Sequence, residues 1–111
     1  MTARTEEEAA YFTLLRAIDE RDALLREHEF MVAERERLEA FAEATREAEQ
    51  ELPRKLDRTV AATTKPLLEA VGARRRAVEQ VLRRMDERLE AAEAFVRECE
   101  EEHARLQAGG S

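Results

Sequence analysis

Glu100 and His103 are the two residues whose types and spacing most directly suggest chemistry. They stand three positions apart near the C-terminal end of the chain. Because residues three apart lie on the same face of a helix, the carboxylate and the imidazole would point the same way. Both groups bind metal ions in proteins. A metal ion is therefore the first ligand to consider, with Glu100 and His103 as its candidate ligands.

The stretch CEEEHARL, which contains this pair, resembles the metal-binding helix of ferritin-like proteins. Those bundles use a Glu-x-x-His motif from each of two helices, together with further inward-facing carboxylates. The first half of this chain has no second Glu-x-x-His motif. The resemblance therefore implies a metal-binding helical oligomer in which another copy supplies the second motif. The simpler interpretation of the pair is a solvated acidic helix end that binds no metal.

A cluster of arginines is the second candidate for chemistry, as a binding site for an acidic ligand. Its members are Arg74, Arg75, Arg76, Arg83, Arg84 and Arg88. Guanidinium groups bind the phosphates of nucleic acids and of anionic membrane surfaces. The whole chain nevertheless carries a net charge of −7, and no aromatic residues alternate with the arginines to stack on bases. Nucleic acid is therefore disfavoured, and we expect these arginines to pair with acidic residues of the first half.

Arg74 differs from its neighbours because a helical wheel places it inside the apolar stripe of its helix. A charge in such a stripe needs a partner, and pairs of this kind can fix the register of two helices. If the chain folds back near Pro53, residues 74–76 lie opposite residues 29–32. We therefore expect Arg74 to meet a carboxylate of the first helix, Glu29 or Glu34, or one of a partner protein. By the same folding, Arg83 and Arg84 would lie opposite acidic residues at 19–22.

The remaining reactive residue types show no catalytic arrangement. His28 lies near the apolar stripe of the first helix, where a histidine can be a ligand but is more often structural. Cys99 lies in the seven-residue repeat of the second helix, with no basic group or histidine poised to activate it. Residues 18–38 resemble the first helix of small all-helical chorismate mutases, which hold a dicarboxylate with Arg and Lys, but no matching layout follows Pro53. No Ser-His-Asp set, glycine-rich phosphate loop or zinc-ligand spacing occurs. We therefore expect a protein that is not an enzyme and uses no cofactor.

Long helices must position these residues, because the composition favours helix throughout. Charged residues make up 41% of the chain and aromatic residues 5%, and the dominant Ala, Glu, Arg and Leu are good helix formers. The pattern TEEE at residues 5–8 is typical of a capping box. No Gly or Pro follows until Pro53. The sequence therefore predicts a first helix over about residues 5–52, with Thr5 as its cap.

Pro53 is the preferred break between two helices, since proline is accepted in the first turn of a helix but disfavoured in its interior. The alternative break is TTKP, where Thr63 or Thr64 would cap a helix that carries Pro66 in its first turn. Residues 53–64 would then form a turn or a short connecting helix.

The second helix is predicted over about residues 65–107, followed by a flexible tail at 108–111. Its apolar residues repeat every seven positions, as in a coiled coil. They are Val78, Met85, Ala92, Cys99 and Leu106. In both helices the apolar stripe is wider than the two positions in seven of a two-helix coiled coil. We therefore predict one all-α domain over residues 1–107, a long antiparallel helical hairpin or coiled coil that dimerises into a four-helix assembly.

The predicted function is protein–protein interaction, as a structural, adaptor or chaperone-like coiled coil that forms a homodimer or binds a protein partner. The interface is expected at Leu14, Ile18, Leu25, Val32, Leu38, Phe41, Val78, Val81, Met85, Leu89, Phe95 and Val96. The chain has one cysteine, no signal-peptide pattern at its start and no apolar run long enough to span a membrane. These features favour a cytoplasmic protein without membrane insertion.

Overall fold

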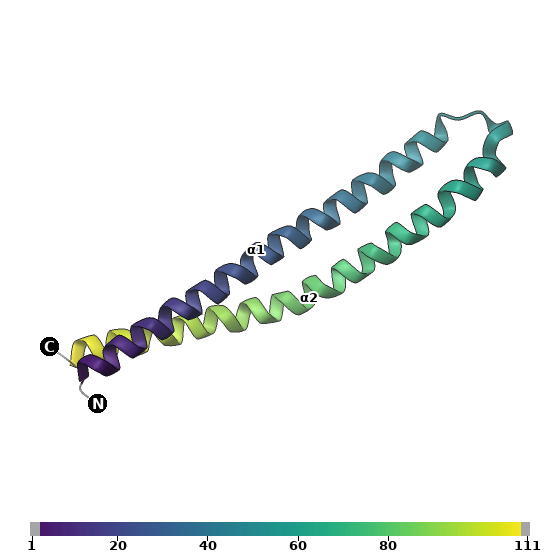
Figure 1. Cartoon of the computed structure of the whole chain (residues 1–111). Helices are drawn as coiled ribbons and strands as arrows, with labels where there is room; N and C mark the ends of the chain where they lie inside the picture. Colours follow the sequence, from purple (N-terminus) through teal and green to yellow (C-terminus); the bar gives the residue numbers. More distant parts are fainter. Residues whose placement is uncertain (1–2, 110–111) are drawn as a thin grey trace. The chain divides into compact units, whose positions relative to one another are not determined.

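The computed structural model describes residues 3–109, and this part of the chain is almost wholly helical (Figure 1). Helix α1 covers Ala3–Gln50, the 3-10 helix η1 covers Arg54–Leu56, and helix α2 covers Asp57–Gly109. No strand occurs among the described residues. The protein is therefore all-α, with two long helices joined by a short connection, which is consistent with a helical hairpin.

The chain leaves α1 just before Pro53. Proline disfavours the helical conformation of the residue before it, and α1 ends at Gln50. Near the end of the helix, the carbonyl of Glu49 accepts a hydrogen bond from the amide only three residues later, that of Leu52, at 3.2 Å. Pro53 then takes an extended conformation (φ −61°, ψ 141°), and its carbonyl accepts a bond from the Leu56 amide at 2.9 Å. This last bond closes η1.

Pro66 lies inside α2, so the alternative break at TTKP is wrong. Helix α2 already begins at Asp57, and the connecting helix is only the three residues of η1. Thr63 and Thr64 do not cap a helix, because their hydroxyls donate to backbone carbonyls one turn earlier in α2, at 3.2 and 2.9 Å. The second helix therefore starts about eight residues before the expected position, and it carries a proline in its interior.

The outer ends of both helices also differ from expectation. Thr5 lies inside α1, which includes Ala3, so Thr5 is not the cap. Alanine and arginine at positions 3 and 4 are good helix formers, which favours this longer helix. Helix α2 continues to Gly109, so residues 108 and 109 are helical and not a flexible tail. The rest of the predicted tail, residues 110–111, lies outside the described residues.

Contacts between α1 and α2 divide the chain into two units. The terminal unit comprises Met1–His28 and Arg84–Ser111, which pairs the start of α1 with the end of α2. The turn unit comprises Glu29–Arg83, which contains the connection between the helices.

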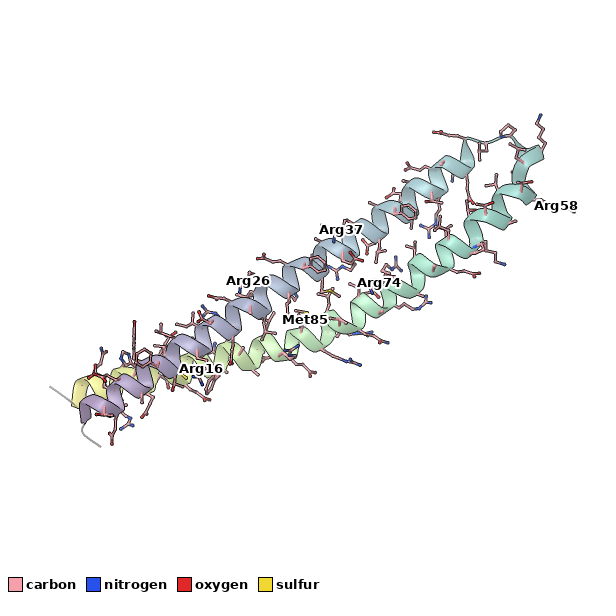
Figure 2. All side chains as sticks on the ribbon, viewed as in Figure 1. Arg16, Arg26, Arg37, Arg58, Arg74 and Met85 are labelled. Carbon is pink, nitrogen blue, oxygen red and sulfur yellow. The ribbon has the colours of Figure 1, made fainter. Side chains whose placement is uncertain are left out.

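Both units have a thin core, because two helices can bury only one stripe of each. In the terminal unit, the buried cluster is Ala17, Val96 and Cys99, with Leu14 and Ile18 packed against it. Figure 2 shows Met85 of this unit turned toward α1, and Met85 is also buried. In the turn unit, the buried side chains are Ala42, Val78 and Leu82. Many large apolar side chains therefore remain outside the two cores.

Neither long helix is suited to cross a membrane. Charged residues recur along both helices, and no stretch of the described residues is long and apolar enough to span a bilayer.

Candidate functional site

The terminal unit carries a row of apolar side chains on α1 that its own fold covers only in part. Tyr11, Leu15 and Leu25 are exposed, and Ile18 between them is half-buried. Their spacings of four, three and seven place them on one side of the helix. Phe12, next to this row, is 64% exposed. We call Tyr11, Leu15, Ile18 and Leu25 the apolar row.

Three carboxylates form a second row, on α2 of the same unit. They are Asp86, Glu93 and Glu100, all exposed and seven residues apart. The first of them lies against α1, because Asp86 Oδ1 is 3.4 Å from His28 Nε2. Gln107 continues the row by seven residues, and it lines the same hollow as Tyr11. The acidic row and the apolar row therefore lie on the same side of the terminal unit, and together we call them the interaction face.

A hollow of about 490 Å³ lies at one end of the interaction face. It is lined by Glu7, Glu8, Tyr11, Phe12, His103 and Gln107. The Tyr11 and His103 rings are 5.4 Å apart between centroids and inclined by 42°, so the half-buried imidazole lies against an aromatic side chain. Because the lining combines aromatic rings with carboxylates, this hollow suits an apolar group carried next to a cation.

The position of His103 bears on the predicted metal site. Glu100 is exposed in the acidic row, whereas His103 is half-buried against Tyr11. Among residues 3–109, no group of three or more His, Cys, Asp and Glu side chains is arranged to hold a metal ion. The pair therefore has no third ligand within the described part of its own chain, and a metal site would need ligands from another copy.

A second hollow of the terminal unit, of about 550 Å³, contains Cys99 in its wall. It is lined by Glu6, Ala9, Ala10, Thr13, Phe95, Glu98, Cys99, Glu102, Arg105 and Leu106. Burial, and then the charge of Glu98, raises the pKa of the Cys99 thiol. Arg105 Nη2 donates to Glu102 Oε1 at 2.6 Å, and this hydrogen bond raises the pKa of Arg105. Cys99 is therefore a small buried group whose thiol holds its proton more tightly than usual.

In the turn unit, Arg74 meets Glu34 of α1. Arg74 Nε lies 3.5 Å from Glu34 Oε1, and Arg37 Nη2 donates to Glu34 Oε2 at 3.0 Å. The hydrogen bond from Arg37, and then that from Arg74, lowers the pKa of the Glu34 carboxyl, although partial burial opposes the shift. The other predicted partner, Glu29, is exposed. Of the two carboxylates that the sequence left open, Glu34 is the one beside Arg74.

Arg74 does not lie inside the apolar stripe as the helical wheel suggested. Its side chain is 60% exposed, because it flanks the buried stripe and extends along the helix surface to reach Glu34. The ion pair is therefore a surface pair, and such pairs typically contribute little to the stability of a fold. Arg37 also lies over the exposed ring of Phe30, at 5.8 Å from the ring centroid.

The register of the turn unit is shifted from the predicted one. The Thr64 hydroxyl, which donates to the Val60 carbonyl, also contacts the carboxylate of Glu49 across the two helices, whereas a fold centred on Pro53 would place Thr64 opposite Ala42. The midpoint of this contact lies between residues 56 and 57, so it is centred beyond Pro53. The expected alignment of residues 74–76 with residues 29–32 is therefore wrong.

Most of the other arginines in the cluster remain unpaired. Arg75 lies 3.7 Å from Glu79 of its own helix. Within residues 3–109, no carboxylate forms an ion pair with Arg76, Arg83, Arg84 or Arg88. All four are exposed. The predicted charge matching with α1 therefore involves Arg74 alone among the arginines of this cluster.

The twelve residues predicted to form the interface fall into three groups. Val78, Met85 and Val96 are buried within the chain, and Leu14, Ile18, Val32, Leu38 and Leu89 are half-buried. Leu25, Phe41, Val81 and Phe95 are exposed. Only the last group, with the half-buried residues beside it, is available to another molecule.

Sequence reasoning missed the acidic row and part of the apolar row. Tyr11, Phe12 and Leu15 were not among the predicted interface residues, although all three are exposed. A signal was present in the sequence, because Asp86, Glu93 and Glu100 each follow a residue of the seven-residue repeat, namely Met85, Ala92 and Cys99.

No protein-family model matches the chain, and no curated protein or solved structure is significantly similar to it. The function must therefore be inferred from the chain's own residues.

Proposed function

We propose that the protein is a non-catalytic interaction protein that self-associates as a dimer through the interaction face of the terminal unit. The observation that carries this proposal is the exposure of Tyr11, Leu15 and Leu25 on one side of α1, next to the more exposed Phe12. Soluble monomers rarely leave contiguous apolar patches uncovered, and such patches usually mark interaction sites. Burial of one leucine or phenylalanine contributes about 1.5–3 kcal/mol, so covering this row favours association.

The structural, adaptor or chaperone-like role expected of a coiled coil fits this proposal, because it requires binding and no chemistry. Among the described residues, Cys99 is buried and the His103 ring packs on Tyr11, which is typical of packing roles. A four-helix assembly would cover the apolar row with helices from a second copy, since a bundle buries about three positions in seven.

The solution mass measured by light scattering behind a sizing column tests the proposal. Twice the chain mass of 12.8 kDa is the expected result. The double variant Leu15→Glu, Leu25→Glu should return the mass to that of one chain, because it places charges in the contact. Ala91→Glu, at an exposed position on α2 of the same unit, is the control and should leave the dimer intact. A wild-type monomer at all accessible concentrations would refute self-association.

A second candidate function is binding of an acidic ligand by the unpaired arginines. Arg76 and Arg83 of the turn unit are exposed and have no carboxylate partner in the described chain. Such a site would give salt-sensitive binding to nucleic acid or to anionic vesicles that Arg76→Ala and Arg83→Ala weaken. If neither probe binds at low salt, this candidate is excluded.

A further inference from the structure

We propose that the interaction face binds residues 54–67 of a second copy of the same chain, which we call the basic segment. This inference rests on the self-association proposed above and names the surface that the second copy contributes. The basic segment comprises η1 and the beginning of α2, and it belongs to the turn unit.

The basic segment is rich in positive charge, which the interaction face lacks. Its cations are Arg54, Lys55, Arg58 and Lys65, with Asp57 as its only acid. All four cations are exposed, and no carboxylate among residues 3–109 forms an ion pair with them. Figure 2 shows Arg58 projecting outward from the turn end of α2. The segment therefore presents uncompensated positive charge to solvent.

The same segment also exposes apolar side chains. Leu56 and Leu67 are exposed, and Val60 between them is half-buried. Val60 and Leu67 are seven residues apart in α2, so they lie on one side of that helix, and Leu56 is the last residue of η1, directly before α2 begins. The basic segment thus offers an apolar stripe flanked by cations.

The interaction face is complementary in both respects. Its apolar row can cover Leu56 and Leu67, and its acidic row supplies carboxylates for the lysine and arginine side chains. Glu93 and Glu100 have no cationic partner among the described residues. The charge difference is broad, because the residues of the terminal unit include 8 basic and 15 acidic side chains. Opposite potentials of this kind select a partner and speed its association.

A second copy is the favoured occupant because one chain carries both complementary surfaces. In a two-fold dimer, the face of each copy contacts the basic segment of the other, so the same contact forms twice and the assembly closes. The alternative occupant of the basic segment is an anionic lipid surface, since exposed leucines beside cations also suit a membrane interface. The experiment below separates the two.

Charge reversal tests the contact. The segment variant is Arg54→Glu, Lys55→Glu, Arg58→Glu, and the face variant is Glu93→Lys, Glu100→Lys. Each variant alone would bring like charges together in both contacts of the dimer. We expect each to weaken self-association by about tenfold or more, as measured by analytical ultracentrifugation at low salt.

Mixing the two variants should restore association, and this is the decisive measurement. In the mixed dimer, an unchanged acidic face meets an unchanged basic segment, and a reversed face meets a reversed segment, so both contacts are attractive. A single chain that carries all five substitutions should also dimerise with itself. Recovery on mixing also shows that both variants still fold. The control Arg46→Glu, Arg76→Glu, Arg83→Glu makes the same charge change at exposed positions of the turn unit outside the basic segment, and it should have the smaller effect.

The outcomes distinguish this contact from self-association itself. If the wild-type protein dimerises and the mixed variants show no recovery, the contact is wrong but the proposed function stands. If the wild-type protein is a monomer, both fail. Binding to vesicles of phosphatidylcholine and phosphatidylserine that is lost in the segment variant and kept in the face variant, without mixed recovery, would assign the basic segment to a lipid surface and overturn the proposal.

Discussion

The terminal unit and the turn unit are built from the same two helices, but they differ in net charge and in how regular helix α2 is. The residues of the terminal unit carry the whole net charge of −7, whereas those of the turn unit contain 11 basic and 11 acidic side chains. In the terminal unit, the α2 repeat from Met85 to Cys99 is uninterrupted and faces a buried cluster. In the turn unit, the same helix contains Pro66 and Gly72.

This difference indicates that the two units differ in binding selectivity and in local stability. An uninterrupted repeat gives the terminal unit the more regular packing, and its excess of carboxylates makes its surface selective for a basic partner. The turn unit accepts residues that weaken a helix, so its local stability should be the lower of the two. The variants below test this ranking by removing the weakening features one at a time.

Pro66→Ala should have the largest effect. Proline in a helix interior removes a backbone hydrogen bond and crowds the preceding turn, at a cost of about 3 kcal/mol in typical helices. Because Pro66 is the tenth residue of α2, its replacement should raise the free energy of unfolding by up to about that amount. Urea denaturation at a fixed chain concentration measures the change, since association also affects apparent stability.

Hydrogen exchange locates the effect of Pro66→Ala. Amides of residues 57–72 should become better protected, and those of the terminal unit should change less. Glu69→Ala, at a nearby exposed position of the same helix, is the control and should alter stability by less than about 0.5 kcal/mol. Equal protection of both units in the wild-type protein would contradict the ranking of their local stabilities.

Gly72→Ala should have an intermediate effect. Glycine in a helix interior costs about 1 kcal/mol relative to alanine. Space is available, because a Cβ built on Gly72 would meet only the end of the Arg76 side chain, at an ordinary contact distance of 3.6 Å. We therefore expect a gain of about 1 kcal/mol in the free energy of unfolding and a higher thermal midpoint. A loss of stability would mean that the helices pack more closely at this position than the structure indicates.

The broad architecture could be predicted from the sequence, because composition and periodicity act over many residues. The absence of Gly and Pro before Pro53 predicted the first helix, and the repeat from Val78 to Leu106 predicted the second. The start of the second helix could not be predicted in this way. Local rules favour Pro66 in a first turn, but the helix continues through it, with the hydroxyls of Thr63 and Thr64 bonded within the helix.

The candidate site was harder to predict, since it depends on the register between the helices. The sequence suggested a symmetrical fold about Pro53, but the contact between Thr64 and Glu49 is centred beyond it, between residues 56 and 57. The helical wheel also placed Arg74 inside the apolar stripe. In the structure, its long flexible side chain extends away from the stripe into solvent and reaches the carboxylate of Glu34. Exposure of the apolar row becomes visible only once the register is known.

The smallest effect should come from Glu34→Gln, which tests the surface pair of the turn unit. The pKa of Glu34 in the folded chain is lowered from its usual value near 4.5, chiefly by the hydrogen bond from Arg37 and then by that from Arg74. A lowered pKa means that the charged form contributes stability above about pH 4.5, and that this contribution is lost as the pH falls through the lowered value.

Glu34→Gln should therefore reduce the free energy of unfolding at pH 7 only slightly, because the pair is close to solvent. The difference from the wild-type protein should vanish at a pH below the lowered pKa. Glu29→Gln, at an exposed position of the same helix, is the matched control. If Glu29→Gln costs as much as Glu34→Gln, the ion pair with Arg74 is not specific to Glu34, and charge pairing does not fix the register of the turn unit.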